Sequence, residues 1–110
     1  MSYIDGFVTP VPARGKEAYR AMAAKAALVL KEYGATRIVE CWGDDIPEGK
    51  VTDFRGAVKA EAGENVVFSW IVFRSRSHRD KVNAKVIADP RLADMMKPGA
   101  MPFDMKRMVY

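Results

Sequence analysis

The segment from 66 to 73 constrains the fold more than any other part of the sequence. It reads Val-Val-Phe-Ser-Trp-Ile-Val-Phe, and Ser69 is its one polar residue. Successive side chains of a β-strand point to opposite faces of a sheet, so a strand of this composition has to be covered on both faces. A domain of 110 residues with two main helices can cover one face. We therefore expect a homodimer, in which a second copy of the chain covers the other face.

Alternating strands and helices are predicted around this segment. Apolar residues at three- and four-residue steps predict an amphipathic helix over 16–33. A second helix is predicted to begin with a capping box, in which Ser77 is the N-cap and Asp80 reaches back, and to end at Asp89 before Pro90. Strands are predicted at 3–9, 36–42, 54–60, 66–73 and 105–110, with 54–60 and 66–73 paired in a hairpin.

The order of these elements indicates an α+β protein with a single domain over residues 1–110. It fits a ferredoxin-like βαββαβ sandwich with an antiparallel sheet and one additional strand in the middle hairpin. Two such sheets packed face to face form a dimeric α+β barrel. The doubly apolar strand is the reason to prefer that architecture.

Several blocks along the chain carry a resemblance to a known family. They are Tyr3-Ile-Asp-Gly-Phe-Val8, Ala18-Tyr-Arg-Ala-Met-Ala-Ala-Lys-Ala26, Ile38-Val-Glu-Cys-Trp42, Gly49-Lys-Val-Thr-Asp-Phe54, Val66-Val-Phe-Ser-Trp70, Asp89-Pro-Arg91, Met101-Pro-Phe-Asp104 and Lys106-Arg-Met108. Together they resemble the YbaA-like bacterial family, domain of unknown function 1428. The resemblance implies a ferredoxin-like fold of the dimeric α+β barrel type in the bacterial cytoplasm. It implies no reaction, so no catalytic residue is carried over.

The positive charge of the chain is local. The formal net charge is +4, and the segment 74–85 alone holds five cations and one anion. Arg74, Arg76, His78 and Arg79 gather at the start of the predicted second helix, where the helix dipole also favours an anion. This cluster is our candidate site for a small anionic ligand in a cavity between sheet and helices. The alternative is that the arginines are solvated or pair with the acidic loop at 44–53.

His78 also supports a second class of function. It is the one histidine of the chain and the best candidate for proton transfer near neutral pH. By analogy of fold, the alternative function is a cofactor-free enzyme of the dimeric α+β barrel type that uses His78. A third hypothesis, an RNA-binding module, needs aromatic side chains free on the sheet face, which the expected dimer would cover. We therefore do not expect nucleic acid as a partner.

The remaining composition argues against several classes of site. Cys41 is the one cysteine, so an internal disulfide is excluded and neither a metal site nor a cofactor is expected. We expect this thiol to be buried and inert. No apolar stretch reaches the roughly 20 residues of a membrane span. The first residues do not resemble a secretory signal, so we expect a cytoplasmic protein without a membrane partner.

Overall fold

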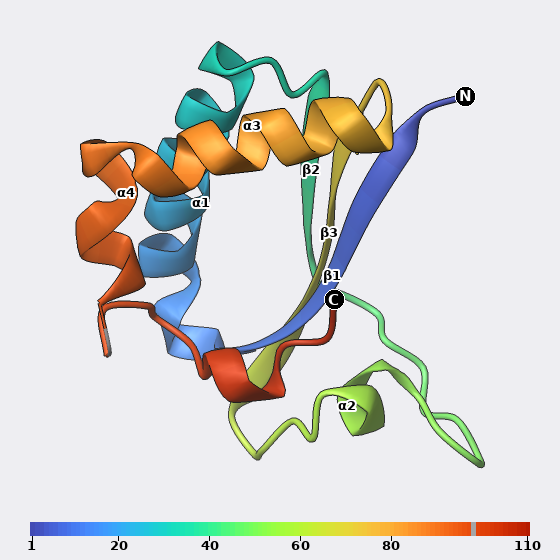
Figure 1. The fold of residues 1–110 in the computed structure, drawn as a ribbon. Helices are drawn as coiled ribbons and strands as arrows, with labels where there is room; N and C mark the ends of the chain where they lie inside the picture. The colour runs from blue at the N-terminus through green and yellow to red at the C-terminus, as the bar shows by residue number, and fades with distance from the viewer. Residues whose placement is uncertain (98) are drawn as a thin grey trace.

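The computed structural model describes residues 1–97 and 99–110, with the side chain of Met96 also left aside. Helices α1, α3 and α4 lie on one side of an antiparallel sheet (Figure 1), so the expected α+β class is confirmed. The elements are β1 (Tyr3–Pro12), α1 (Lys16–Glu32), β2 (Arg37–Trp42), α2 (Phe54–Ala57), β3 (Glu64–Phe73), α3 (Arg76–Ala88) and α4 (Pro90–Ala93), with 3-10 turns at Ala13–Gly15, Asp94–Met96 and Met105–Arg107.

The sheet has the strand order β1-β3-β2, so the doubly apolar segment is its central strand. Both neighbours run antiparallel to β3, with Tyr3 opposite Phe73 and Trp42 opposite Val67. β1 continues beyond the predicted strand through Pro10 and Pro12. Proline is tolerated there because most of the outer edge of β1 has no ladder partner.

The predicted strand at 54–60 is wrong, because this segment contains the short helix α2. Asp53 adopts an extended conformation and accepts a hydrogen bond from the Gly56 amide at 2.6 Å, which starts the helical turn. Val58 is then fully buried and Lys59 adopts a positive φ of 50°. A local N-cap outweighs the β-prone composition here, and β3 pairs with β2 instead of with 54–60.

The predicted strand at 105–110 is reduced to a single antiparallel bridge. Val109 and Val8 exchange two backbone hydrogen bonds of 2.9 Å. The preceding residues form a 3-10 turn, because Asp104 accepts from the Lys106 amide and Arg107 binds both carboxylate oxygens of Glu64 at 2.7 and 2.8 Å. Those side-chain contacts bend the chain away from β1 before it reaches Val109.

The start of α3 also differs from the predicted capping box. Ser75, not Ser77, is the N-cap, and its hydroxyl accepts from the His78 amide at 3.1 Å. Asp80 pairs instead with its neighbour Arg79. Ser75 is the first serine after β3, so its extended backbone lets the helix begin immediately after the strand.

The core lies between the helices and one face of the sheet. One cluster joins Leu30, Ala35, Phe73 and Val82, and a second joins Val11, Tyr19 and Val67. The other face of the sheet keeps large apolar side chains in contact with solvent: Ile4 is 56% and Phe68 44% exposed. Within one copy of the chain, β3 is therefore fully covered on its helix side alone.

A buried carboxylate fastens α1, α3 and α4 to one another. Asp89 is 5% exposed and accepts hydrogen bonds from the Tyr33 hydroxyl at 2.6 Å and from the Arg91 guanidinium at 2.9 Å. Arg91 also pairs with Glu32 at the end of α1. Hydrogen bonds from Arg91 and Tyr33 hold the pKa of Asp89 far below its usual range.

Replacing this carboxylate gives a test of the helix junction. We expect Asp89→Asn to lower the melting temperature at pH 7, because the amide removes the buried charged partner of Arg91 and leaves it only the exposed pair with Glu32. The folded-state pKa of Asp89 is depressed, so its contribution is complete above the unfolded value of 3.8 and is lost as the pH falls below it. The difference between wild type and variant therefore shrinks in acid. Thermal unfolding across pH measures it.

Asp94→Asn is the matched control, because this carboxylate is 81% exposed and forms only a surface pair with Lys97. Its melting temperature should stay at the wild-type value. Equal losses in both variants, or a loss at Asp89 that does not depend on pH, would contradict the assigned role.

Candidate functional site

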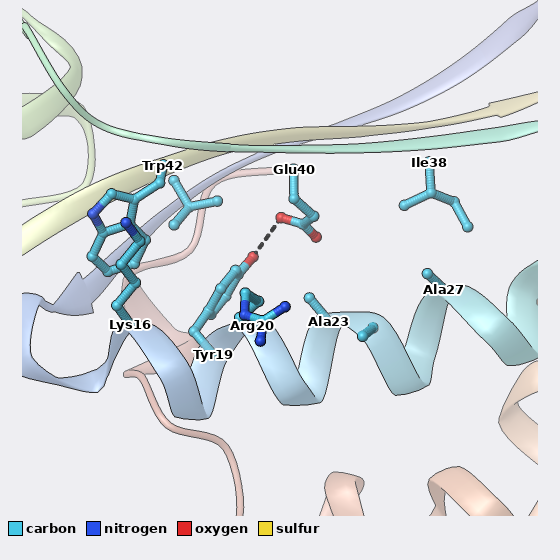
Figure 2. Close-up of a pocket in the computed structure, with 10 residues that line it drawn as sticks. Lys16, Tyr19, Arg20, Ala23, Ala27, Ile38, Glu40 and Trp42 are labelled. Atoms are coloured by element: carbon cyan, nitrogen blue, oxygen red, sulfur yellow. Dashed lines mark hydrogen bonds between the residues drawn. The ribbon is translucent and has the colours of Figure 1, made fainter.

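A cavity of about 340 Å³ lies between α1 and the edge of the sheet formed by β2 (Figure 2). A smaller cavity of about 150 Å³ adjoins it under α1 and shares part of its wall. Two alanines of α1, Ala23 and Ala27, line both spaces and leave room where larger side chains would reach the sheet. Ile38, Trp42 and Val67 complete an apolar wall on the strand side.

The polar centre of the cavity joins α1 to β2. Tyr19 is 7% exposed on the inner face of α1, and its hydroxyl donates to Glu40 Oε2 at 2.8 Å (Figure 2). Glu40 stands opposite Ser69 in the pairing of β2 with β3, which brings the serine to the same face of the sheet. Part of Glu40 remains exposed because β2 is an edge strand, while its carboxylate turns inward to Tyr19.

The electrostatics of this centre are unusual for a carboxylate. Burial raises the pKa of Glu40, while its interactions with the Tyr19 and Ser69 hydroxyls work in the opposite direction. Burial and the adjacent Glu40 charge raise the pKa of Tyr19 far above its ordinary value. In the part of the chain that the structure describes, no lysine or arginine forms an ion pair with Glu40. This carboxyl can therefore exchange a proton or receive a hydrogen-bond donor from a ligand.

Aromatic rings and two cations surround the entrance. The Tyr19 ring lies 6.5 Å from the Trp42 ring and 5.8 Å from Phe103, measured between centroids. Lys16 Nζ lies 5.6 Å from the centroid of the Trp42 ring. Arg20 also lines the space, but it is strongly exposed and pairs with Glu17 at 3.2 Å. The entrance thus combines aromatic faces with solvated positive charge.

The cluster predicted from the sequence lies elsewhere, at the turn from β3 into α3. Arg74 and Arg76 are exposed. Arg79 binds Asp5 at 3.0 Å, lies over the Tyr3 ring at 5.0 Å, and lines a separate cavity of about 390 Å³ with that aspartate. The acidic loop does not supply its partner. The pairing with Asp5 is set by β1 lying close to α3, which local sequence patterns do not reveal.

His78 is half-buried at the same turn. Its Nδ1 accepts a hydrogen bond from the Arg74 amide at 3.0 Å, and its ring stands edge-on to Phe73 with centroids 6.0 Å apart. These contacts hold the imidazole in the turn between strand and helix. Neither His78 nor any of the three arginines lines the two cavities under α1.

Glu40 and Tyr19 were not among the residues predicted for the site. A signal for Glu40 was present in the sequence, because it lies between Ile38 and Trp42 at the two-residue spacing of one strand face. A carboxylate between two inward-facing apolar residues indicates a polar spot in the core. Tyr19 gave no such signal, since its place on the apolar stripe of α1 is equally typical of core packing.

Comparisons with known proteins agree with the resemblance noted from the sequence. The model of the family described as "Protein of unknown function (DUF1428)" matches residues 2–105. The chain belongs to the DUF1428 family. Two relatives, each described as "Uncharacterized protein YbaA", come from Escherichia coli (strain K12) and Shigella flexneri. Each is 60% identical to this DUF1428 chain over 110 residues, which is all of this chain and 92% of the relative.

The described residues of this DUF1428 chain lack two kinds of feature. No helix within 1–97 and 99–110 is long and apolar enough to cross a membrane. The same residues contain no group of three or more histidine, cysteine or acidic side chains arranged to hold a metal ion. The expected absence of a metal or cofactor stays a prediction.

Titration of the glutamates tests the electrostatics of the DUF1428 cavity. We expect Glu40 to titrate above the ordinary value of 4.5 and Glu64, bound to Arg107, to titrate below it. Tyr19→Phe removes a hydrogen bond that favours the carboxylate and so raises the pKa of Glu40 further. Carbon-detected NMR of the side-chain carboxyls follows each group separately. A Glu40 midpoint at or below that of Glu64 would contradict this description.

Proposed function

We propose that this chain is one subunit of a homodimer that binds a small organic molecule in the cavity between α1 and β2. The observation that carries the proposal is the Tyr19–Glu40 hydrogen bond in a mainly apolar space whose other polar lining residues are Lys16 and Arg20. Ligand sites are typically concave and mostly apolar, with a few polar groups that orient the ligand, and volumes start at about 300 Å³. The cavity of about 340 Å³ around Glu40 fits that description.

The position of the Tyr19–Glu40 pair lowers the stability of the fold. Burying a carboxylate with neutral partners opposes folding, as the raised pKa of Glu40 indicates. An apolar residue at position 40 would pack between Ile38 and Trp42 without that penalty. Residues that break local packing rules in this way are typical of binding and catalytic sites.

Filling the cavity tests whether it is the ligand-binding site. We expect Ala27→Phe to abolish binding of any ligand that occupies the space, because Ala27 lines both cavities. Binding is found by screening small aromatic and aliphatic molecules with tryptophan fluorescence, and amide chemical shifts then show whether the cavity is the site. Ala21→Phe, on the exposed side of the same helix, is the control and should bind as wild type. Ligands that bind the filled variant equally well would place the site elsewhere.

The proposal of a homodimer depends on the face of the sheet opposite α1, α3 and α4, which α2 contacts where Phe54 packs against Phe68. At its middle lie Phe68 and the half-buried Trp70, whose rings are 5.4 Å apart between centroids. Its charged groups lie at the ends: Arg37 opposite Val72 at one end, and the pair formed by Glu64 with Arg107 at the other. An apolar centre with a polar rim is the usual composition of a protein interface. Two copies related by a two-fold axis would bury the same patch on each other.

Two further features support this arrangement. Cys41 is exposed, contrary to the expected buried thiol, and it stands opposite Phe68 on the open face. A second copy packed there would bury it. The Val8–Val109 bridge lies on the outer edge of β1, where a ferredoxin-like βαββαβ sheet carries its last strand. A ferredoxin-like subunit in a dimeric α+β barrel remains the finer proposal for the fold.

Charging the middle of the open face tests the dimer. We expect Trp70→Glu to shift the protein from dimer to monomer in analytical ultracentrifugation, because a buried unpaired carboxylate opposes association. Leu28→Glu is the control, since Leu28 is 59% exposed on α1, away from this face. A wild-type protein that is monomeric and stably folded at micromolar concentration would contradict the two-copy architecture.

The anionic ligand expected at Arg74, Arg76, His78 and Arg79 is the weaker proposal. Asp5 already neutralises Arg79, and the turn between β3 and α3 already uses His78. Arg74 and Arg76 remain exposed, where attraction to a single anion is screened by water and salt. The cofactor-free enzyme that uses His78 depends on the same residue and is weaker for the same reason.

A further inference from the structure

We infer that the ligand of this cavity is a small organic amine, whose ammonium group binds the Glu40 carboxylate while its apolar body lies against Trp42 and the alanines of α1. The inference rests on the proposed function, because it names the chemistry of a ligand in that same cavity. Its basis is a partly buried carboxylate that lacks a cation, at the centre of a mainly apolar space.

The carboxylate of Glu40 turns inward to Tyr19 although the residue as a whole is exposed on the edge strand, and it lacks a charged partner. Its one hydrogen bond of standard geometry comes from the neutral Tyr19 hydroxyl, and no described cation pairs with it. Elsewhere in this chain, buried carboxylates are paired: Asp89 binds Arg91 and Glu64 binds Arg107 at 2.7 to 2.9 Å. The fold therefore supplies a guanidinium at those two positions and none at Glu40. An ammonium ligand would complete the missing pair with a charge-assisted hydrogen bond.

The electrostatic environment of Glu40 is consistent with an ammonium ligand. Burial raises the pKa of Glu40, so the unpaired negative charge is unfavourable there. A cation arriving next to the carboxylate removes that penalty. An anion would add repulsion to it, and a neutral hydrogen-bond donor would relieve it less than a cation, because it carries no opposite charge.

The aromatic rings at the entrance also suit a cation. Lys16 holds its ammonium 5.6 Å from the centroid of the Trp42 ring, a distance typical of a cation–π contact. Lys16 and Arg20 are exposed, and Arg20 is compensated by Glu17, so water and salt screen their repulsion. Glu40 is also exposed as a residue, but its carboxylate is hydrogen-bonded to the buried Tyr19 and faces the space between α1 and β2.

The shape of the space limits the body of the amine. Ala23 and Ala27 line both adjoining spaces, of about 340 and 150 Å³, between the helix and Ile38 (Figure 2). Side chains that end at Cβ leave a slot beside Glu40 that a planar or unbranched group can enter. An arylalkyl amine fits this description, with its ring near Trp42 and its ammonium at Glu40.

Three probes with the same apolar body test the head group: 2-phenylethylamine, 2-phenylethanol and phenylacetate. Dissociation constants at pH 7 are measured by tryptophan fluorescence, to which both Trp42 and Trp70 contribute, and by amide chemical shifts of α1 and β2, which locate the binding. We expect the amine to bind about ten- to a hundredfold more tightly than the alcohol, as a charge-assisted hydrogen bond predicts, and phenylacetate to bind most weakly.

Two variants of the Tyr19–Glu40 pair test whether Glu40 causes the preference for the amine. Glu40→Gln keeps the size of the side chain and removes its charge, so amine binding should fall to the level of the alcohol while alcohol binding stays unchanged. Tyr19→Phe keeps the carboxylate, so the preference for the amine should persist. Glu17→Gln is the matched control, because it removes an exposed carboxylate from the same helix, and it should leave all three constants unchanged.

The outcomes separate this inference from the proposed function. If the alcohol or phenylacetate binds in the cavity as tightly as the amine, or if Glu40→Gln leaves amine binding intact, the amine is wrong and the cavity still binds ligands. If phenylacetate binds and shifts amides around Arg74 and Arg76 instead, the amine inference is wrong. The ligand site is then the anion site at the start of α3. If none of the probes shifts a cavity residue and the wider screen for cavity ligands also fails, both proposals are overturned.

Discussion

The apolar central strand β3 is the constraint on which the rest of the structure depends. Its odd-numbered residues from Val67 to Phe73 face the helices, and its even-numbered residues from Val66 to Val72 face the other way. The helices of one chain cover the first set. The second set includes Phe68, which stays 44% exposed. The strand thus sets both the position of the helices and the apolar face that remains available for association.

The candidate site lies where the apolar pattern of β3 is interrupted. Ser69 is the one polar residue on β3 between Val66 and Phe73, and pairing with β2 sets Glu40 opposite it. Above this point the helix carries Tyr19, Ala23 and Ala27, so a polar centre and a space occur together. A leucine at position 23 or 27 with an apolar residue at 40 would give an ordinary closed core. The cavity therefore depends on the side chains at a few positions of an otherwise regular helix–sheet interface.

Much of the fold could be predicted from the sequence because its signals are periodic. The three- and four-residue spacing in α1 and the apolar run of β3 predicted both elements closely. The errors occur where single side-chain contacts decide: Asp53 starts α2 and Ser75 caps α3 through local hydrogen bonds, while Arg107 binds Glu64, 43 positions away. Such contacts outweigh composition over a few residues, and sequence patterns describe longer windows.

The site was harder to predict, because its residues meet through tertiary structure. Tyr19 and Glu40 are 21 positions apart, and Arg79 and Asp5 are 74 apart. The density of positive charge along the sequence predicted a site at the arginines. The more unusual electrostatic environment is that of Glu40 on β2.

The open face and the cavity share one strand, so the two proposals are physically connected. Phe68 and Trp70 point to the open face, and Ser69 between them points to the cavity. Packing a second copy against the two aromatic residues would restrict the backbone that carries Ser69 and, through the ladder, Glu40 on β2. A dimer would thereby order the polar centre before a ligand arrives and reduce the entropic cost of binding. Because β2 is an edge strand held by β3 alone, the position of Glu40 depends on this central strand more than on any contact of its own.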